Sequence, residues 1–238
     1  MNDTDTITTP ESYSVATDAS TLASINSLTV FAAGPKETPA VLGGVHLSRT
    51  GTDWAHFTAQ TTNRYVVGQL TTTANVGFYK SADDHALVSK WANDATLWID
   101  QTTLKQAVAM AKTNKFAPIT IGYDSTRATG YVSVGDTVMY SAPSPGAFPP
   151  VGKLFPTEEP NGVETLSINP KWLAMLTKVV GPLSAGGTLK DAPWIFDFFH
   201  TDPHTGDTSG PKHKPVLAHV NGDQWEIKVL IQPTLIRR

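Results

Sequence analysis

The segment Phe148-Pro149-Pro150-Val151-Gly152-Lys153-Leu154-Phe155-Pro156 is a proline-bearing apolar stretch, interpreted as a strand, that closes two passes of one pattern. Each pass consists of a strand, a helix and further strands. A third pass ends in a comparable stretch, Lys228-Val229-Leu230-Ile231-Gln232-Pro233. A repeated strand-helix-strand unit with no catalytic constellation indicates a scaffold rather than an enzyme.

The composition is typical of a globular protein. The chain has 238 residues and 40% hydrophobic content, which is enough for one large or two ordinary domains. It contains no cysteine, so disulfides and thiolate metal sites are excluded, and we expect a cytoplasmic location. No secretory leader or membrane-length apolar run is present, so no membrane partner is expected. The net charge of −3 argues against nucleic-acid binding by the whole surface, but is compatible with a local basic lining.

The first two units share one order of elements. In the first, a strand at 13–15 precedes a helix at about 19–33, for which Asp18 or Thr17 is the expected N-cap. Strands are then expected at 41–48, 54–59 and 65–72, followed by a short helix near 84–91. In the second, a strand at 95–99 leads to a helix that begins at Asp100 or Thr102 and runs to about 113. Strands are then expected at 119–121, 128–134 and 137–140, and a hairpin at Gly135-Asp136 joins the last two.

The third unit repeats the order with a strand at 164–168 and a helix capped by Asn169-Pro170 that runs to about Val180. Its strands are expected at 194–199, 215–220 and 225–231, with Asn221-Gly222 as a hairpin turn. Periodicity predicts buried stripes on all three helices: Leu22, Ile25, Leu28 and Val30; Leu104, Ala107, Val108 and Ala111; and Leu173, Leu176 and Val180.

The helices differ on their polar faces. The second carries Lys105 and Lys112, with Lys115 just past its end, and the third carries Lys171 and Lys178. The first helix has Ser20, Ser24 and Ser27 in place of cations, so we expect neutral packing or water-mediated contact from it. The lysines alone are equally compatible with ordinary solvated helix faces.

Four segments resemble the bacterial DNA polymerase sliding clamp, the ring-shaped processivity factor built from βαβββ half-domains. Residues 42–47 resemble the family strand beginning L-x-G-x-x-x, and residues 59–65 its A-T-D-G-x-R-L segment. Residues 148–156 are similar to the F-P-D-Y-x-x-x-L-P domain link, and residues 229–235 to the V-V-M-P-M-R-L terminus. Their order follows the middle and last domains of a clamp.

The resemblance implies an α+β clamp fold with helices inside and antiparallel sheets outside a ring. Residues 11–156 would form one domain of two βαβββ units, and residues 157–238 a shorter domain with one unit. A family ring has twelve half-domains, so three per chain would close with four subunits, whereas a hidden fourth would close with three. Nothing corresponds to a first domain, which suits a divergent, shortened member such as a phage would encode.

The resemblance also implies partners. Duplex DNA would be bound without sequence preference through its phosphates by Lys105, Lys112, Lys115, Lys171 and Lys178. Polymerase and clamp-loader peptides would insert into an apolar groove between domains, carried over here as Leu42, Thr62, Tyr65, Pro149, Leu154, Leu230, Gln232 and Pro233. The chain departs from the family at Thr61, Thr62 and Gln232, which replace an Asp, a Gly and a Met. No catalytic residue, cofactor or metal is expected.

Two alternatives remain at this point. A clamp-like module could dock peptides without encircling DNA. A metal-dependent hydrolase could use His200, Asp202, His204 and Asp207, because imidazoles and carboxylates at close spacing can ligate zinc. These four residues lie in a Gly-, Pro- and Thr-rich connection, where His and Asp are ordinary turn residues. The sequence contains no Walker loop, H-E-x-x-H, G-x-S-x-G or G-x-G-x-x-G motif.

Overall fold

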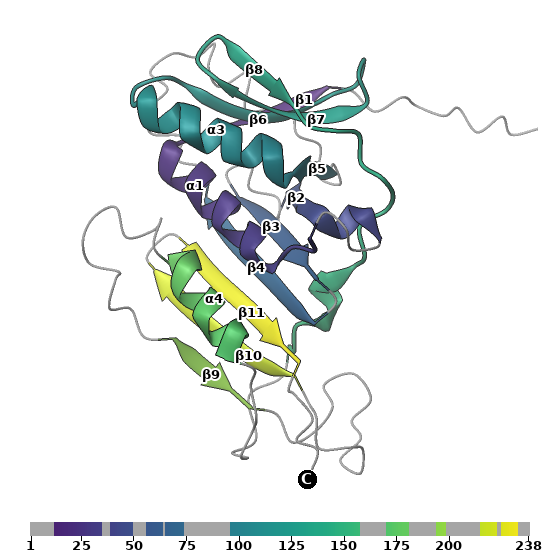
Figure 1. The fold of residues 1–238 in the computed structure, drawn as a ribbon, viewed down its shortest axis with the longest axis vertical. Helices are drawn as coiled ribbons and strands as arrows, with labels where there is room; N and C mark the ends of the chain where they lie inside the picture. Colours follow the sequence, from purple (N-terminus) through teal and green to yellow (C-terminus); the bar gives the residue numbers. More distant parts are fainter. Residues whose placement is uncertain are drawn as a thin grey trace, which may run out of the picture.

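The computed structural model describes residues 12–34, 39–49, 56–63, 65–73, 96–157, 170–180, 194–198, 215–222 and 225–232. Within these ranges the chain is an α+β protein with antiparallel sheets, as the sequence predicted (Figure 1). The helices are α1 (Ala19–Ser27), α3 (Gln101–Thr113) and α4 (Pro170–Val180). The strands are β1 (Tyr13–Thr17), β2 (Gly44–Arg49), β3 (His56–Thr62), β4 (Val66–Thr73), β5 (Thr96–Asp100), β6 (Ile119–Asp124), β7 (Thr129–Val134), β8 (Thr137–Tyr140), β9 (Ile195–Asp197), β10 (Val216–Gly222) and β11 (Trp225–Ile231).

The first two units exchange their first strands. β1 pairs antiparallel with β6 in a four-stranded sheet of order β1-β6-β7-β8, whereas β5 pairs with β2 in the larger sheet. Each opening strand therefore joins the meander of the other unit. Neither unit forms a sheet of its own, so the two fold as one body.

Close contacts hold the two sheets together where β1, β5 and β7 meet. The Tyr13 hydroxyl on β1 donates a hydrogen bond to the carbonyl of Thr96 on β5. Gly130 on β7 lies so near β5 that an added Cβ would stand 2.6 Å from the Trp98 carbonyl oxygen. Only a glycine allows this approach without displacing the backbone.

The third unit extends the larger sheet. β11 pairs antiparallel with β4 along its length, with Ile231 opposite Val66 and Trp225 opposite Thr72. The sheet has the order β5-β2-β3-β4-β11-β10-β9, so it crosses the boundary proposed at 156/157 without a break. At its end, His219 Nε2 on β10 lies 3.0 Å from a carboxylate oxygen of Asp197 on β9.

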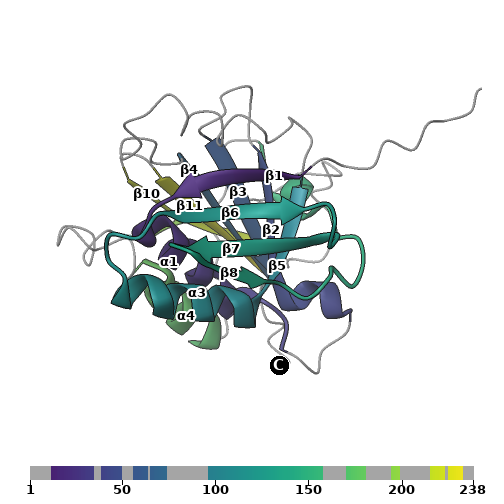
Figure 2. The same ribbon diagram turned by 90° about the horizontal axis from the view of Figure 1, so that it is seen from above.

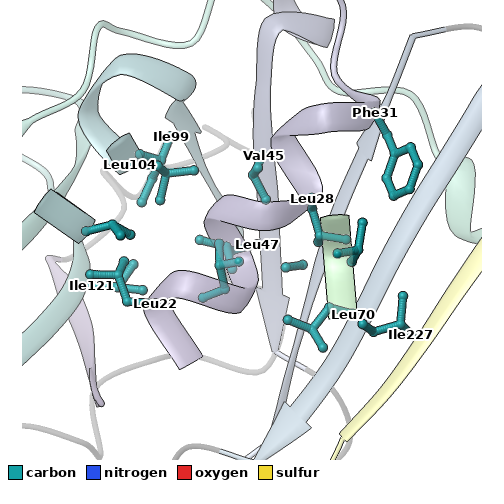
Figure 3. Close-up of a cluster of buried hydrophobic side chains, with 14 of the residues drawn as sticks. Leu22, Leu28, Phe31, Val45, Leu47, Leu70, Ile99, Leu104, Ile121 and Ile227 are labelled. Atoms are coloured by element: carbon teal, nitrogen blue, oxygen red, sulfur yellow. The ribbon is translucent and has the colours of Figure 1, made fainter. Parts of the chain in front are cut away.

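The hydrophobic core lies between the sheets and a helix layer, and the close-up in Figure 3 shows a cluster of its buried side chains. Leu22, Ile25 and Leu28 are fully buried, as expected for the first helix. The helix ends earlier than predicted, at Ser27, and continues as a 3₁₀ turn over Leu28–Phe31. In this tighter turn Phe31 rather than Val30 becomes the buried residue.

Several predicted boundaries were wrong. Residues 41–43, expected to begin a strand, lie in a 3₁₀ turn over Ala40–Gly43 before β2. Residues 151–154 of the proline-bearing stretch form another 3₁₀ turn rather than a strand. Asn221 and Gly222 are the last residues of β10, with Gly222 opposite Trp225. The predicted hairpin at Gly135-Asp136 is confirmed, since Val134 pairs with Thr137 across it and Gly135 has a φ of 58°.

Some predictions concern residues outside the described ranges. These are the strand at 164–168, the helix near 84–91, the capping residue Asn169 and the terminal residues 1–10. In the part of the chain that is described, no helix is both long and apolar enough to cross a bilayer.

Candidate nucleic-acid interface and partner groove

The three described helices lie side by side on one face of the molecule (Figure 2). α1 is central and contacts both α3 and α4. Of its three serines, Ser20 is exposed, whereas Ser24 and Ser27 are buried, and the Ser27 hydroxyl lies 3.3 Å from the Val179 carbonyl oxygen of α4. Both hydroxyls also donate to carbonyls of the preceding turn. Small, internally satisfied side chains let the neighbouring helices pack closely on α1.

All five predicted DNA-contacting lysines are exposed, and they belong to or follow the two flanking helices. Lys105 and Lys112 lie on α3, Lys115 follows it, and Lys171 and Lys178 lie on α4. A separation of seven residues is about two turns, or roughly 10.5 Å along a helix, so each pair projects from one side of its helix. Lys171 also lies 5.3 Å from the Trp172 ring centroid.

The described helices contain no acidic residue at all. The chain as a whole carries more acidic than basic residues, with 21 Asp and Glu against 18 Lys and Arg. The helix layer is therefore positive on a protein of net negative charge. A surface of this charge attracts polyanions.

Asp100 fixes the N-terminus of α3. The Asp100 carboxylate accepts hydrogen bonds from the backbone N–H groups of Thr102 and Thr103, at 2.7 and 2.9 Å. It also accepts bonds from Ser141 and from the Ala142 N–H. Partial burial raises the pKa of Asp100, but these hydrogen bonds outweigh burial and hold the pKa below its usual value. Asp100 thus ties α3 to the end of β8.

The buried stripe of α4 differs from the predicted one. Leu176 and Val179 are buried, and Trp172 and Met175 pack partly against the core. Leu173, predicted as buried, is 41% exposed. Trp172 and Val179 therefore share the core-facing side with Leu176, and Leu173 lies outside it.

Residues 148–155, which we call the link, pack against part of the opposite face of the larger sheet. Val151 and Phe155 of the link pack with Val67, Leu217 and Leu230 in a small cluster separate from the main core. Alternation along β11 explains this, because Ile227, Val229 and Ile231 point to the helices and Leu230 points the other way. Leu154, by contrast, is 43% exposed.

Three more of the predicted groove residues lie in or beside β3, β4 and β11. Tyr65 is 63% exposed, and its carbonyl accepts a hydrogen bond from the Gln232 N–H at 3.1 Å. Thr62 is buried and donates to the Val66 carbonyl. The structure therefore brings Tyr65 and Gln232 together at the β4–β11 joint.

Leu42 belongs to a third cluster, with Ala33, Val41 and the partly buried Trp98. Phe148 of the link contacts both this cluster and the one around Leu230. Pro149 is half-buried, and its carbonyl accepts the Val151 N–H. Pro233 lies outside the described residues, so its place in the groove stays a prediction.

Sequence reasoning missed two residues that fix the link. Phe148 stacks on His46 of β2 with ring centroids 4.9 Å apart and an interplanar angle of 1°. Burial lowers the pKa of His46, which favours the neutral ring at pH 7. The alternation of β2 indicates which face His46 occupies, but nothing in the sequence indicates that Phe148 folds back over that strand.

The residues of the metal-site alternative, His200, Asp202, His204 and Asp207, lie outside the described ranges. Within those ranges no three His, Asp or Glu side chains gather in a way that could hold a metal ion.

No protein-family model and no curated protein sequence matches the chain. The DNA polymerase III subunit beta from Pseudomonas aeruginosa matches in structure with a TM-score of 0.65 and 12% identity over 95% of this chain and 67% of that one. A second structure, the DNA polymerase sliding clamp from Pseudomonas aeruginosa with ligand, gives 0.63 and 11% over 95% and 66%.

The H. pylori beta clamp in complex with diflunisal gives a TM-score of 0.63 and 10% identity over 95% of this chain and 67% of that clamp. The chain thus spans about two thirds of the length of these proteins. Identities this low establish architecture alone, but the architecture extends over almost the whole chain. The protein therefore has the fold of the bacterial DNA polymerase sliding clamps.

Proposed function

We propose that the protein is a DNA sliding clamp: a ring of several chains that encircles duplex DNA and tethers a polymerase to its template. It has no active site in this proposal. The observation that carries the proposal is the acid-free, lysine-bearing helix layer on one face of a clamp fold.

The charge distribution supports DNA contact from the helices. Exposed lysines on α3 and α4 flank a neutral, tightly packed α1, so positive charge forms two lines beside a central helix. Such lysines would meet phosphates, which are the same in every sequence, and the contacts would be sequence-independent and salt-sensitive. A ring with this lining would be free to slide.

The other face supports the recruitment of partners. Tyr65, beside the β4–β11 joint, and Leu154 of the link have exposed side chains, and Val151 and Phe155 of the link pack with Leu230. A short peptide from a polymerase or clamp loader would place a few apolar anchors there, because a few desolvated contacts dominate such affinities. The helix layer would remain free for DNA.

Retention on DNA of defined topology tests this function. The protein is bound to a nicked circular plasmid, separated by gel filtration at moderate salt, and challenged with an enzyme that cuts the plasmid once. An encircling ring stays on the circle and slides off after cutting. A plasmid cut but blocked at both ends by bulky protein–DNA complexes is the control, and should retain the ring.

Equal retention on circular and open linear plasmid would contradict encirclement and favour ordinary surface binding. A protein that ignores DNA but binds polymerase peptides would be the peptide-docking module instead.

A further inference from the structure

Phe116 is the most exposed large apolar side chain in the described part of the chain. Its relative exposure is 100%, whereas the other exposed side chains of this kind range from 41% to 63%. Phenylalanine is among the residue types most often found buried, because water disfavours contact with its apolar ring. A ring left wholly in water therefore suggests a surface that receives a partner.

The turn that carries Phe116 is held by hydrogen bonds. It follows the C-terminal end of α3 and leads into β6. The Asn114 N–H donates to the Met110 carbonyl of α3, and the Ala117 N–H donates to the Asn114 carbonyl, both at 3.0 Å. The second bond closes a tight turn in which Lys115 and Phe116 are the two central residues. Phe116 thus stands at the tip of the turn.

The chain beyond Phe116 is anchored as well. The Pro118 carbonyl accepts a hydrogen bond of 2.8 Å from the Gly135 N–H in the hairpin between β7 and β8. Ala117 is partly buried and packs against the main core. The backbone around Phe116 is therefore ordered before any partner arrives, so that binding loses less conformational entropy.

The surroundings of Phe116 along the chain are positively charged. Lys112 lies in the last turn of α3, Lys115 directly precedes the ring, and both are exposed. Between Asp100 and Asp124 the sequence contains no acidic residue. α3 is also part of the helix layer (Figure 2). Charge therefore favours a polyanion as the partner of this turn.

An aromatic ring beside lysines is a combination suited to single-stranded nucleic acid. The lysines bind phosphates, and the ring stacks on a base, whose flat face is present in every sequence. In a duplex each base is already stacked between its neighbours, and extracting it costs pairing and stacking energy. A duplex therefore offers phosphates to Lys112 and Lys115 but no free base to Phe116.

We infer that Phe116 stacks on an unpaired base of single-stranded DNA next to the duplex, with Lys115 against an adjoining phosphate. The inference rests on the proposed function, because the helix layer that would hold the duplex includes α3. A clamp with this site would bind best where a duplex passes into a single strand, as it does at the end of a primer. The site adds recognition of DNA structure to phosphate contacts that recognise charge alone.

Fluorescence anisotropy with two labelled probes tests the inference. One probe is a blunt duplex, and the other is the same duplex with a single-stranded overhang. The parent protein should bind the overhang probe more tightly. Phe116→Leu keeps an apolar side chain but removes the ring, so it should reduce this preference by about fivefold or more and leave the affinity for the blunt duplex unchanged. Phe116→Tyr keeps the ring and is the matched control, which should retain the preference.

The fluorescent adenine analogue 2-aminopurine locates the contact, because its emission depends on how it is stacked. It is placed at each overhang position in turn. With the parent protein and Phe116→Tyr, the emission should change at a position near the duplex end, and with Phe116→Leu this change should be lost. Circular dichroism and sedimentation velocity establish that the variants fold and associate as the parent does, as expected for an exposed side chain.

The contrary results are distinct. Equal affinity of the parent protein for the two probes, or a preference that Phe116→Leu leaves unchanged, would overturn the inference and leave the duplex clamp standing. Loss of polymerase-peptide binding in Phe116→Leu, with the DNA preference intact, would overturn it by making Phe116 a protein contact. A parent protein that binds neither probe would overturn both the inference and the proposed function.

Discussion

Neutralising two lysines on one side of α3 should reduce the salt dependence of DNA binding by a predictable amount. Lys105 and Lys112 are exposed and two turns apart, and glutamine keeps their length and helix propensity. Each phosphate contact contributes about 0.9 to the slope of log K against log salt on duplex DNA. Lys105→Gln with Lys112→Gln should therefore make the slope shallower by about 1.8.

The slope of log K against log salt sets how much DNA affinity is lost between two salt concentrations. With one chain's five lysines engaged, the parent protein should lose roughly 500-fold in affinity between 50 and 200 mM salt, from a slope of about −4.5. The double variant should lose only about 40-fold over the same range. Fluorescence anisotropy with a short labelled duplex, titrated at four or five salt concentrations, measures both values.

The matched control removes the same charge from the opposite face. Lys153 lies on the link, and Lys228 lies on β11 beside Leu230 and opposite Gln69. The Lys228–Glu226 ion pair is partly exposed, so its loss should cost little stability. Lys153→Gln with Lys228→Gln should leave the slope unchanged. Equal slope changes in both double variants would refute the assignment of DNA contact to the helix layer.

Further predictions concern the groove and the fold. Leu154→Ala should weaken binding of a polymerase-derived peptide in calorimetry with little loss of stability. Leu230→Ala should destabilise the chain by about 2–5 kcal/mol in urea unfolding, because Leu230 is buried. Equal losses of stability in the two variants would contradict the assignment of Leu154 to the surface and Leu230 to the core. Gly68→Ala should cost about 1–3 kcal/mol, because its Cβ would meet a buried phenylalanine ring at 2.5 Å, and Gly43→Ala, with its nearest neighbour at 3.9 Å, is the control. Asp100→Ala should lower stability by about 0.5–2 kcal/mol at pH 7. The folded-state pKa of Asp100 is lowered, so its contribution to stability is present above about pH 3.9 and is lost as pH falls through the lower folded pKa. Melting curves of the parent and the variant should therefore converge in acid. A difference in melting temperature that stays constant with pH would contradict this.

The repeat and the helix cores were predictable because they depend on local periodicity. Leu104, Ala107, Val108 and Ala111 are spaced to face one side of any helix they form, and all four are buried. Asp18 and Asp100 cap their helices as expected, since an aspartate before a helix satisfies free N–H groups. These signals lie within a few residues of one another.

What the sequence could not predict depends on contacts between distant segments. The exchange of β1 and β5 between units, and the pairing of β4 with β11, leave no pattern within either strand. The hydrophobic pattern of β11 is the same whether the face that carries Leu230 is open to a peptide or covered by Val151 and Phe155, as it is here. The burial of Ser24 and Ser27 likewise follows from the position of α1 between two helices, where small residues favour close packing.

Electron microscopy of the protein bound to a duplex of about forty base pairs tests the central claim most directly. The account predicts an annulus with DNA density passing through its hole, and with α1, α3 and α4 forming the inner wall. Images in which the helix layer faces outward, or in which the duplex lies along the strand face of an open particle, would contradict it.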